Sequence, residues 1–226
     1  MRIEKAKFQT ASLKTIRSFY EELLGLPVVR SEEESFTVKV GWSEITFNET
    51  ESAAREGHYY HFAFTVPENK LPEAKAWIEA KTSIGVEAGK DISFSESWNS
   101  HSVYFEDPAG NILELIARHT MGNAVDRPFD PQLDLLGVSE IGVPTKDVPE
   151  ATDRLEELGV MTYKSRSDSF NPVGDDEGLF ILVSPGRRWH FTDKTAESFP
   201  FEAAVRGIGE MRVYEDSRGL VVEINK

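Results

Sequence analysis

The sequence predicts an α+β protein built from repeated β-α-β-β-β modules, because one order of elements recurs along the chain and one of its hairpins occurs twice. Segments rich in β-forming residues alternate in polarity, which is typical of strands. The segment after the first strand of each module instead repeats its apolar residues at helical spacing. The 226 residues suit one large domain or two small ones.

The clearest module occupies residues 61–116. A helix is expected at 69–79, with Pro72 in its first turn, where proline is tolerated. The sequence DPAG at 107–110 is typical of a tight turn. Strands are expected at residues 61–66, 91–95, 101–105 and 112–116.

The same order is expected on both sides of this module. In the first module a helix follows Ser12 and ends near Gly25, and in the third a helix lies between Asp147 and Gly159. The first module has expected strands at 6–10, 27–30, 35–40 and 44–47, and the third at 140–145, 161–165, 179–183 and 188–191. Expected strands at 201–206, 210–214 and 220–224 indicate a fourth module without its helix.

A repeated hairpin supports this division of the chain. Residues 103–114 match residues 212–223, with Gly110 aligned to Gly219 and Glu114 to Glu223. Residues 120–132 contain two prolines and little periodicity, as linkers do. We therefore expect a first half at 1–118, a linker at 119–135 and a second half at 136–226.

Composition narrows the expected partners. The chain has 25 basic and 39 acidic residues, a net charge of −14 and no cysteine. This charge disfavours nucleic acid, and no apolar run approaches the ~20 residues that span a bilayer. Thiolate metal sites are excluded, and a signal peptide is not evident at the start. We expect a cytoplasmic protein with a small-molecule ligand, bound to neither nucleic acid nor membrane.

Two phrases resemble the vicinal oxygen chelate superfamily, which includes glyoxalase I, bleomycin-resistance proteins, extradiol dioxygenases and fosfomycin-resistance proteins. SFYEELLGLPVV resembles the end of its first helix, and YFEDPAGNILELIAR resembles its closing hairpin. The resemblance implies curled mixed sheets and two glyoxalase-like halves. The second half is expected to be a degenerate cup, because Glu140 and Glu223 fall at its first-strand and last-strand positions and no histidine joins them. The resemblance leaves open whether the cup is closed by the chain itself or by a homodimer.

The resemblance also implies a set of metal ligands, because two consecutive modules of such proteins share one cup. Carried over by position, the ligands are Glu44, His61 and Glu114, and Lys5 stands at the fourth position. One imidazole and two carboxylates suit Mn²⁺, Fe²⁺, Ni²⁺ or Zn²⁺. Lys5 favours an alternative of equal weight, a metal-free site in which its ammonium pairs with Glu44 or Glu114.

Three residues are expected to take part in catalysis. The run from Tyr104 to Glu114 resembles part of the extradiol dioxygenase signature, and a Glu ligand can double as a base. His101 would share a strand face with the cup and act as an acid or base, although a structural histidine is the commoner outcome.

These residues predict a metal-dependent enzyme of the glyoxalase or dioxygenase type, either a lyase or isomerase or a ring-cleaving dioxygenase. One alternative is a metal-free, bleomycin-resistance-like protein that binds small molecules. Another is a regulatory role for a chain whose second half has lost its site.

Overall fold

The computed structural model describes residues 1–217 and 219–225, and it confirms the predicted α+β class with curled sheets. The first module contains β1 (Ile3–Thr10), α1 (Leu13–Arg17) continued by the π-helical η1 (Ser18–Leu23), β2 (Val28–Ser31), β3 (Ser35–Val40) and β4 (Ser43–Glu49). Helix α2 (Glu51–Glu56) follows it. The second module contains β5 (His61–Thr65), α3 (Leu71–Glu79), β6 (Ser93–Ser95), β7 (Ser100–Glu106) and β8 (Ile112–Arg118).

The second half begins after α4 (Pro131–Asp134). The third module contains β9 (Gly137–Pro144), α5 (Val148–Glu157), β10 (Phe170–Asp175) and β11 (Gly178–Val183). The remaining strands are β12 (Phe201–Val205), β13 (Gly209–Asp216) and β14 (Gly219–Asn225). None of the helices in the described part of the chain is long and apolar enough to cross a membrane.

Local signals read from the sequence hold at several helix ends. The Asp147 side chain accepts a hydrogen bond from the Glu150 N–H, which caps α5, and Pro72 lies in the first turn of α3. Gly25 and Gly159 adopt positive φ values after the first helix and after α5, as glycine readily does.

Two expected strands of the third module were wrong. Residues 161–165 and 188–191 form only isolated bridges, through Thr162 to Val173 and through Arg188 to Thr195. Strand β10, which was not predicted, pairs with β11 instead. Residues 161–165 contain little apolar surface to bury in a sheet, whereas in 188–191 the rings of Trp189 and Phe191 pack on His61 and Tyr104 without a strand ladder.

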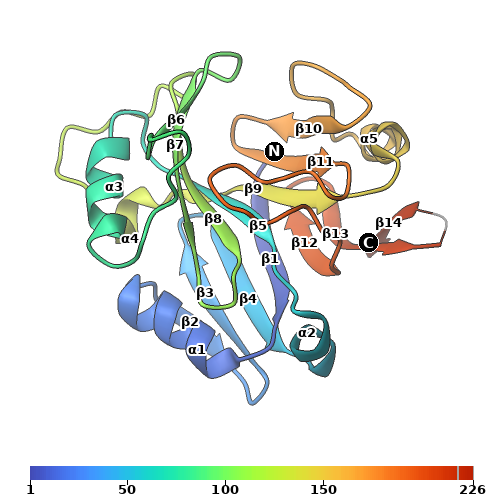
Figure 1. Ribbon diagram of the computed structural model, residues 1–226, viewed down its shortest axis with the longest axis horizontal. Helices are drawn as coiled ribbons and strands as arrows, with labels where there is room; N and C mark the ends of the chain where they lie inside the picture. Colours follow the sequence, from blue (N-terminus) through green and yellow to red (C-terminus); the bar gives the residue numbers. More distant parts are fainter. Residues whose placement is uncertain (218, 226) are drawn as a thin grey trace.

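The strand pairing defines two cups in one continuous sheet (Figure 1). In each of the first three modules the first strand pairs in parallel with the last, β1 with β4, β5 with β8 and β9 with β11. Antiparallel pairing of β5 with β9 forms the β5/β9 cup from modules two and three. Antiparallel pairing of β1 with β12 forms the β1/β12 cup from the first module and the last three strands.

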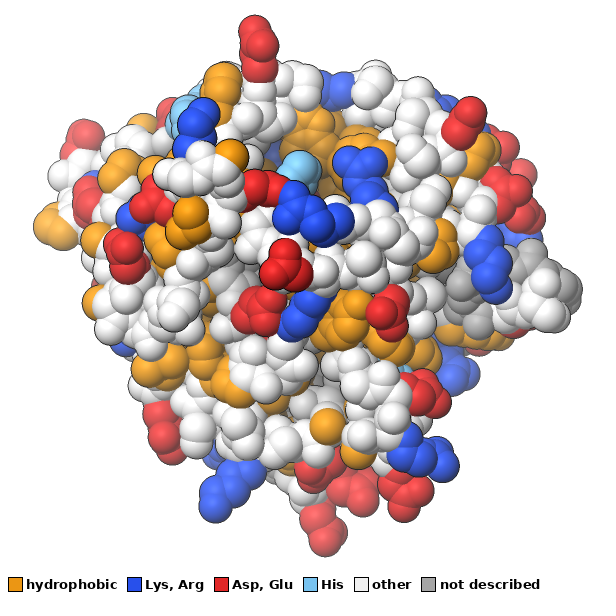
Figure 2. Space-filling model, in the orientation of Figure 1, with side chains coloured by type: hydrophobic (Ala, Val, Ile, Leu, Met, Phe, Trp, Pro, Cys, Tyr) orange, Lys and Arg blue, Asp and Glu red, His pale blue; other side chains and the backbone are white. Residues whose placement is uncertain are grey.

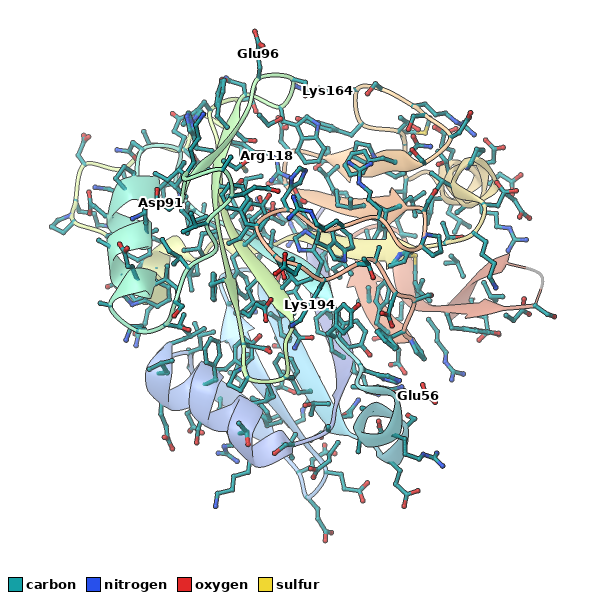
Figure 3. All side chains as sticks on the ribbon, in the orientation of Figure 1. Glu56, Asp91, Glu96, Arg118, Lys164 and Lys194 are labelled. Carbon is teal, nitrogen blue, oxygen red and sulfur yellow. The ribbon has the colours of Figure 1, made fainter. Side chains whose placement is uncertain are left out.

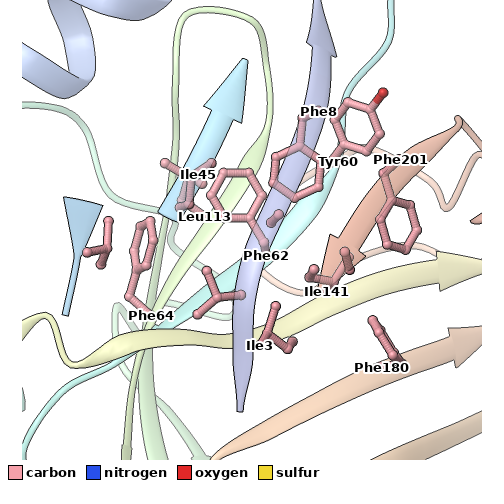
Figure 4. Packing of buried hydrophobic residues seen from close by; sticks show 14 of the residues in the cluster. Ile3, Phe8, Ile45, Tyr60, Phe62, Phe64, Leu113, Ile141, Phe180 and Phe201 are labelled. Atoms are coloured by element: carbon pink, nitrogen blue, oxygen red, sulfur yellow. The ribbon is translucent and has the colours of Figure 1, made fainter. Parts of the chain in front are cut away.

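The expectation that modules one and two share a cup is therefore wrong. These modules instead meet through their apolar faces, where the rings of Phe8 and Phe62 stack with centroids 4.8 Å apart. Figure 4 shows this core between the sheets, with Ile45, Leu113 and Ile141 around the two rings. Because strand side chains alternate, burying Phe62 in the core turns its neighbour His61 to the opposite face.

The fourth module also departs from the predicted pattern. Its strands form an antiparallel meander in the order β12-β13-β14, so β14 does not pair with β12. In the matching hairpin of module two, β8 lies between β7 and β5. The repeated hairpin sequence is therefore placed differently in the two modules.

Candidate metal centre

Three buried side chains from three strands converge at the bottom of the β5/β9 cup. They are His61 on β5, Glu114 on β8 and Glu140 on β9. The strand register brings them together, because Ala63 is the Cα partner of both Glu114 and Glu140. His61 lies two residues before Ala63 and so shares its face of the sheet.

The geometry of this triad is that of a compact ligand set. His61 Nε2 lies 3.6 Å from Glu114 Oε2 and 3.9 Å from Glu140 Oε2. The three ligand atoms all lie within 4.8 Å of one another. His61 Nδ1 is 3.1 Å from the Ile112 carbonyl oxygen, to which we assign it as donor, so Nε2 is the nitrogen that faces the carboxylates, as a donor when the ring is charged and as a ligand when it is neutral.

Burial of two carboxylates together changes how they bind protons. Burial, reinforced by the Glu140 carboxylate, raises the pKa of Glu114 to about 7, although His61, Ser102 and Arg118 act in the opposite direction. For His61, burial disfavours the charged ring. The hydrogen bond and charge of Glu140 and the charge of Glu114 outweigh that effect and raise the pKa of His61.

Arg118 fixes one side of the triad. Its side chain is fully buried, and its guanidinium contacts a Glu140 carboxylate oxygen and the Ser139 hydroxyl. The guanidinium carbon also lies 5.8 Å from the centre of the Trp98 ring. Since Arg118 binds Glu140 Oε1, the other oxygen of that carboxylate is the one that faces His61.

A cavity of about 250 Å³ opens above the triad. One part of its wall is aromatic, from Trp98, Phe170 and Trp189, and another carries serine hydroxyls from β6, β7 and the turn between them. Arginines lie at its mouth. Figure 2 shows Lys and Arg side chains beside a histidine around a hollow with apolar atoms at its base.

The segment between β11 and β12, residues 184–200, crosses this cavity, and we call it the strap. Its Trp189 ring packs on the His61 ring with centroids 4.6 Å apart, and its Phe191 ring stacks on Tyr104 at 5.0 Å. Lys194 Nζ binds Glu106 at 2.7 Å and the Gly110 carbonyl at 2.6 Å, at the β7–β8 hairpin (Figure 3). The strap therefore covers the triad and is held to module two.

The predicted site residues separate into two groups. His61 and Glu114 come together as expected, and Tyr104 lines the same cavity. Burial and the charges of Glu114 and Glu140 raise the pKa of Tyr104 well above its usual value, so its hydroxyl keeps its proton.

Glu44 does not belong to this group. It lies on β4 in the other cup, where its carboxylate is 4.0 Å from the ammonium of Lys39. Lys5 also lies there, exposed, with its ammonium 3.0 Å from Glu210. Lys5 and Glu44 are partners in the β1/β4 ladder, but the structure, over the residues it describes, has no ion pair of Lys5 with Glu44 or Glu114, on which the metal-free alternative rested.

His101 also lies away from the triad. It does not line the cavity, and its Nδ1 lies 2.8 Å from His119 Nε2 at the far end of β7. Its ring packs on exposed Phe94. On β7 the residues that line the cavity are Ser100, Ser102 and Tyr104, so strand alternation turns His101 to the opposite face, and its expected place in the cup was wrong.

The sequence pattern placed Glu140 on the first strand of module three, but it did not predict that Glu140 lies beside His61. Glu140 occupies in module three the first-strand position that His61 occupies in module two, so the repeat was its signal. It was expected with Glu223 in a separate, degenerate cup. Glu223 instead lies on β14, where it accepts a hydrogen bond from the Tyr214 hydroxyl.

The fourth corner of the site is apolar. In module two, Glu114 is the strand partner of Ala63, two positions after His61. In module three, the residue two positions after Glu140 is Gly142, and its strand partner is Ile181. Ile181 is buried and lines the cavity. The ligand set therefore has three members and one open side.

Comparison with known proteins agrees with this architecture. The model of the glyoxalase/bleomycin resistance protein/dioxygenase superfamily matches residues 2–115, just over half of the chain. A model described as toxoflavin-degrading enzyme matches residues 138–188. A search of curated proteins found no match.

Solved structures show the same fold. Glyoxalase I from Zea mays is 14% identical with a TM-score of 0.54, over 98% of this chain and 91% of that chain; a mutant form of the same enzyme gives 0.57 at 14%, over 98% and 92%. A provisionally named dioxygenase from Bacillus subtilis subsp. subtilis str. 168 is 18% identical with a TM-score of 0.56, over 81% of this chain and 63% of that one. The sequence match and the modular fold together show that the chain belongs to the glyoxalase/bleomycin resistance protein/dioxygenase superfamily, the vicinal oxygen chelate proteins.

Proposed function

We propose that this protein is a metal-dependent enzyme of the glyoxalase or dioxygenase type, which acts on a small oxygen-bearing molecule in the β5/β9 cup. The observation that carries the proposal is the buried triad of His61, Glu114 and Glu140. Mn²⁺, Fe²⁺, Ni²⁺ and Zn²⁺ all accept one imidazole and two carboxylates.

The residues present fit such an ion. Two ligands that each lie about 2.1 Å from one ion can be at most about 4.2 Å apart, and the 3.6 Å and 3.9 Å separations from His61 Nε2 fall within that limit. Two buried carboxylates repel each other, as the raised pKa of Glu114 indicates, and Arg118 balances only one of them. A divalent cation supplies the missing charge.

The arrangement supports Lewis-acid chemistry with proton transfer. When bound, the ion would polarise vicinal oxygens of a substrate. Ile181 leaves one side of the ligand set free for those oxygens. With a pKa near neutrality Glu114 can accept or return a proton, and the neighbouring Tyr104 hydroxyl can donate a hydrogen bond. Trp189 covers His61 and excludes water from it.

Two findings favour an enzyme over a metal-free binding protein. Lys5 lies in the other cup, so its ammonium does not neutralise the triad. In addition, the residues that resemble a toxoflavin-degrading enzyme include Glu140, Ile181 and the start of the strap. These observations support degradation or rearrangement of a small substrate rather than its sequestration.

The test is the metal content of the purified protein. We expect about one transition-metal ion per chain, and His61→Ala should lose it. His101→Ala, which removes a histidine outside the cavity, should keep it. At a metal concentration of 100 Kd the bound ion should stabilise the metal-free protein by about 2.7 kcal/mol. A metal-free protein whose unfolding does not shift with excess Mn²⁺, Fe²⁺, Ni²⁺ or Zn²⁺ would contradict the proposal.

A further inference from the structure

We propose that the β5/β9 cup selects a planar, conjugated ring that carries an anionic substituent, with Arg187 as the residue that binds the anion. The inference rests on the proposed function, because the metal would hold the opposite end of the same molecule. It adds the substrate class and the residue that determines it.

Arg187 differs from the other cations around the site. Arg118 is paired with Glu140, Arg188 with Glu87, and Lys194 with Glu106. Arg187 also lines the cavity, but within the described residues no carboxylate pairs with its guanidinium. In a chain with 39 acidic residues, a guanidinium left unpaired at the mouth of a buried site is available to a ligand.

The aromatic wall lies directly beneath this guanidinium. The Arg187 guanidinium carbon is 4.7 Å from the centre of the Phe170 ring, and Phe170 lies 6.3 Å from Trp98. Contact with a ring holds an arginine in place while its edge stays free to donate hydrogen bonds. Trp98, Phe170 and Trp189 together offer flat apolar surface, on which a planar ring packs better than a flexible chain.

Charge is distributed along the cavity in one direction. The closed end holds Glu114 and Glu140, which a divalent ion would neutralise, and the open end holds Arg187. A molecule with vicinal oxygens at one end and an anion at the other matches this gradient. The serine hydroxyls along the wall can bind polar atoms of the ring between these ends.

The experiment compares two molecules of nearly equal shape. We would titrate the Mn²⁺-loaded protein with 3,4-dihydroxybenzoate and with 3,4-dihydroxybenzamide, by calorimetry, after measuring Mn²⁺ binding itself. The benzoate should bind at least about ten-fold more tightly, as expected for a charge-assisted bidentate contact. Arg187→Met should remove this preference without changing Mn²⁺ affinity.

Arg166→Met is the matched control. Arg166 pairs with Asp153 and Glu156 and does not line the cavity, so its loss changes the net charge equally and should keep the preference. Equal affinity for the two compounds in the Mn²⁺-loaded wild type, or a preference that survives Arg187→Met, would overturn the inference and leave the metal proposal standing. Failure to bind Mn²⁺, Fe²⁺, Ni²⁺ and Zn²⁺ alike would overturn the proposed function and this inference with it.

Discussion

At the scale of residues, the site concentrates charge that is costly to bury. His61, Glu114 and Glu140 are each less than 7% exposed, and only Arg118 among the nearby cations is as deeply buried. Such a cluster weakens the metal-free fold and strengthens metal binding, because the same desolvated carboxylates that repel each other attract a cation. Binding and stability therefore respond to pH in opposite ways.

The metal-free protein should become less stable as the pH rises from about 5 to about 7. The pKa of Glu114 is about 7 in the folded protein against 4.5 ordinarily, so in this window the folded chain keeps a proton that the unfolded chain has released. The raised pKa of His61 acts in the same direction. The loss from Glu114 is on the order of 3 kcal/mol. Urea unfolding at pH 5 and pH 8 measures it.

Glu114→Gln provides the control for this prediction. The variant cannot release the proton, so its stability should change much less over the same range, while its metal binding should be lost. In the wild type, stabilisation by added Mn²⁺ should grow as the pH rises, because metal and proton compete for Glu114. A metal-free wild type that gains stability between pH 5 and pH 8 would show that Glu114 is ionised in the fold.

Arg118 should act through the orientation of Glu140. Arg118→Lys keeps the charge but cannot contact Glu140 and Ser139 together, so we expect metal affinity to fall by about 10- to 100-fold. Metal titration monitored by calorimetry measures the change. Arg127→Lys is matched to it, because Arg127 also pairs with a buried carboxylate, Asp134, outside the cavity. Equal loss of metal affinity in both variants would refute this role.

At the scale of elements, the strap decides how well the site is closed. It has little regular structure, and it is held by aromatic contacts near the triad and by the ion pairs of Arg188 and Lys194 with module two. Stability in such a segment is local, so its ion pairs influence opening more than global unfolding.

Lys194→Met should loosen the strap without unfolding the protein. Lys194 loses its contacts with Glu106 and Gly110, so residues 184–200 should be cleaved faster in limited proteolysis. An exposed pair contributes about 1 kcal/mol or less to global stability, so the urea midpoint should change little. Lys75→Met, which removes an ion pair on α3, should leave cleavage of the strap unchanged. Unaltered cleavage of the Lys194 variant would mean that the contacts of Lys194 do not hold the strap.

Elements of the chain were more predictable than their partners. Period-two and helical spacing located most strands and helices, and the repeat placed His61 and Glu140 on the first strands of their modules and Glu114 on a last strand. The sequence carries no comparable signal for pairing between modules. β5 pairs with β9 and not with a strand of module one, and the paired residues are far apart in the sequence. The prediction that Glu44 is a metal ligand assumed that modules one and two share a cup. The metal-free alternative based on Lys5 made the same assumption.

At the scale of the whole molecule, one sheet joins the two cups. Ile3 of β1 pairs with Val138 of β9. Next to this junction, the backbone N–H of Trp42 donates a hydrogen bond to the Leu136 carbonyl oxygen. The core between the sheets is also continuous. We therefore expect the chain to unfold in a single cooperative transition that metal bound in one cup shifts as a unit. Two transitions, of which only one responds to metal, would contradict this expectation.

Gly137→Ala should destabilise both cups together. A Cβ atom at this position would overlap the Trp42 ring, and forced repacking of this kind costs about 1–3 kcal/mol. Chemical unfolding monitored by circular dichroism measures the loss. In a Trp42→Ala background the same substitution should cost little, which separates the overlap from any effect of the backbone. A full loss in that background would place the cause elsewhere.

Ile181 has a consequence for how this site could have arisen. In an assembly of identical chains related by a two-fold axis, every substitution appears at both equivalent corners of a shared cup. Here modules two and three lie in one chain, so Glu140 can replace a histidine and Ile181 a glutamate without altering His61 and Glu114. Duplication within a single gene thus permits an asymmetric site, with metal-binding residues on one side and access for the substrate on the other.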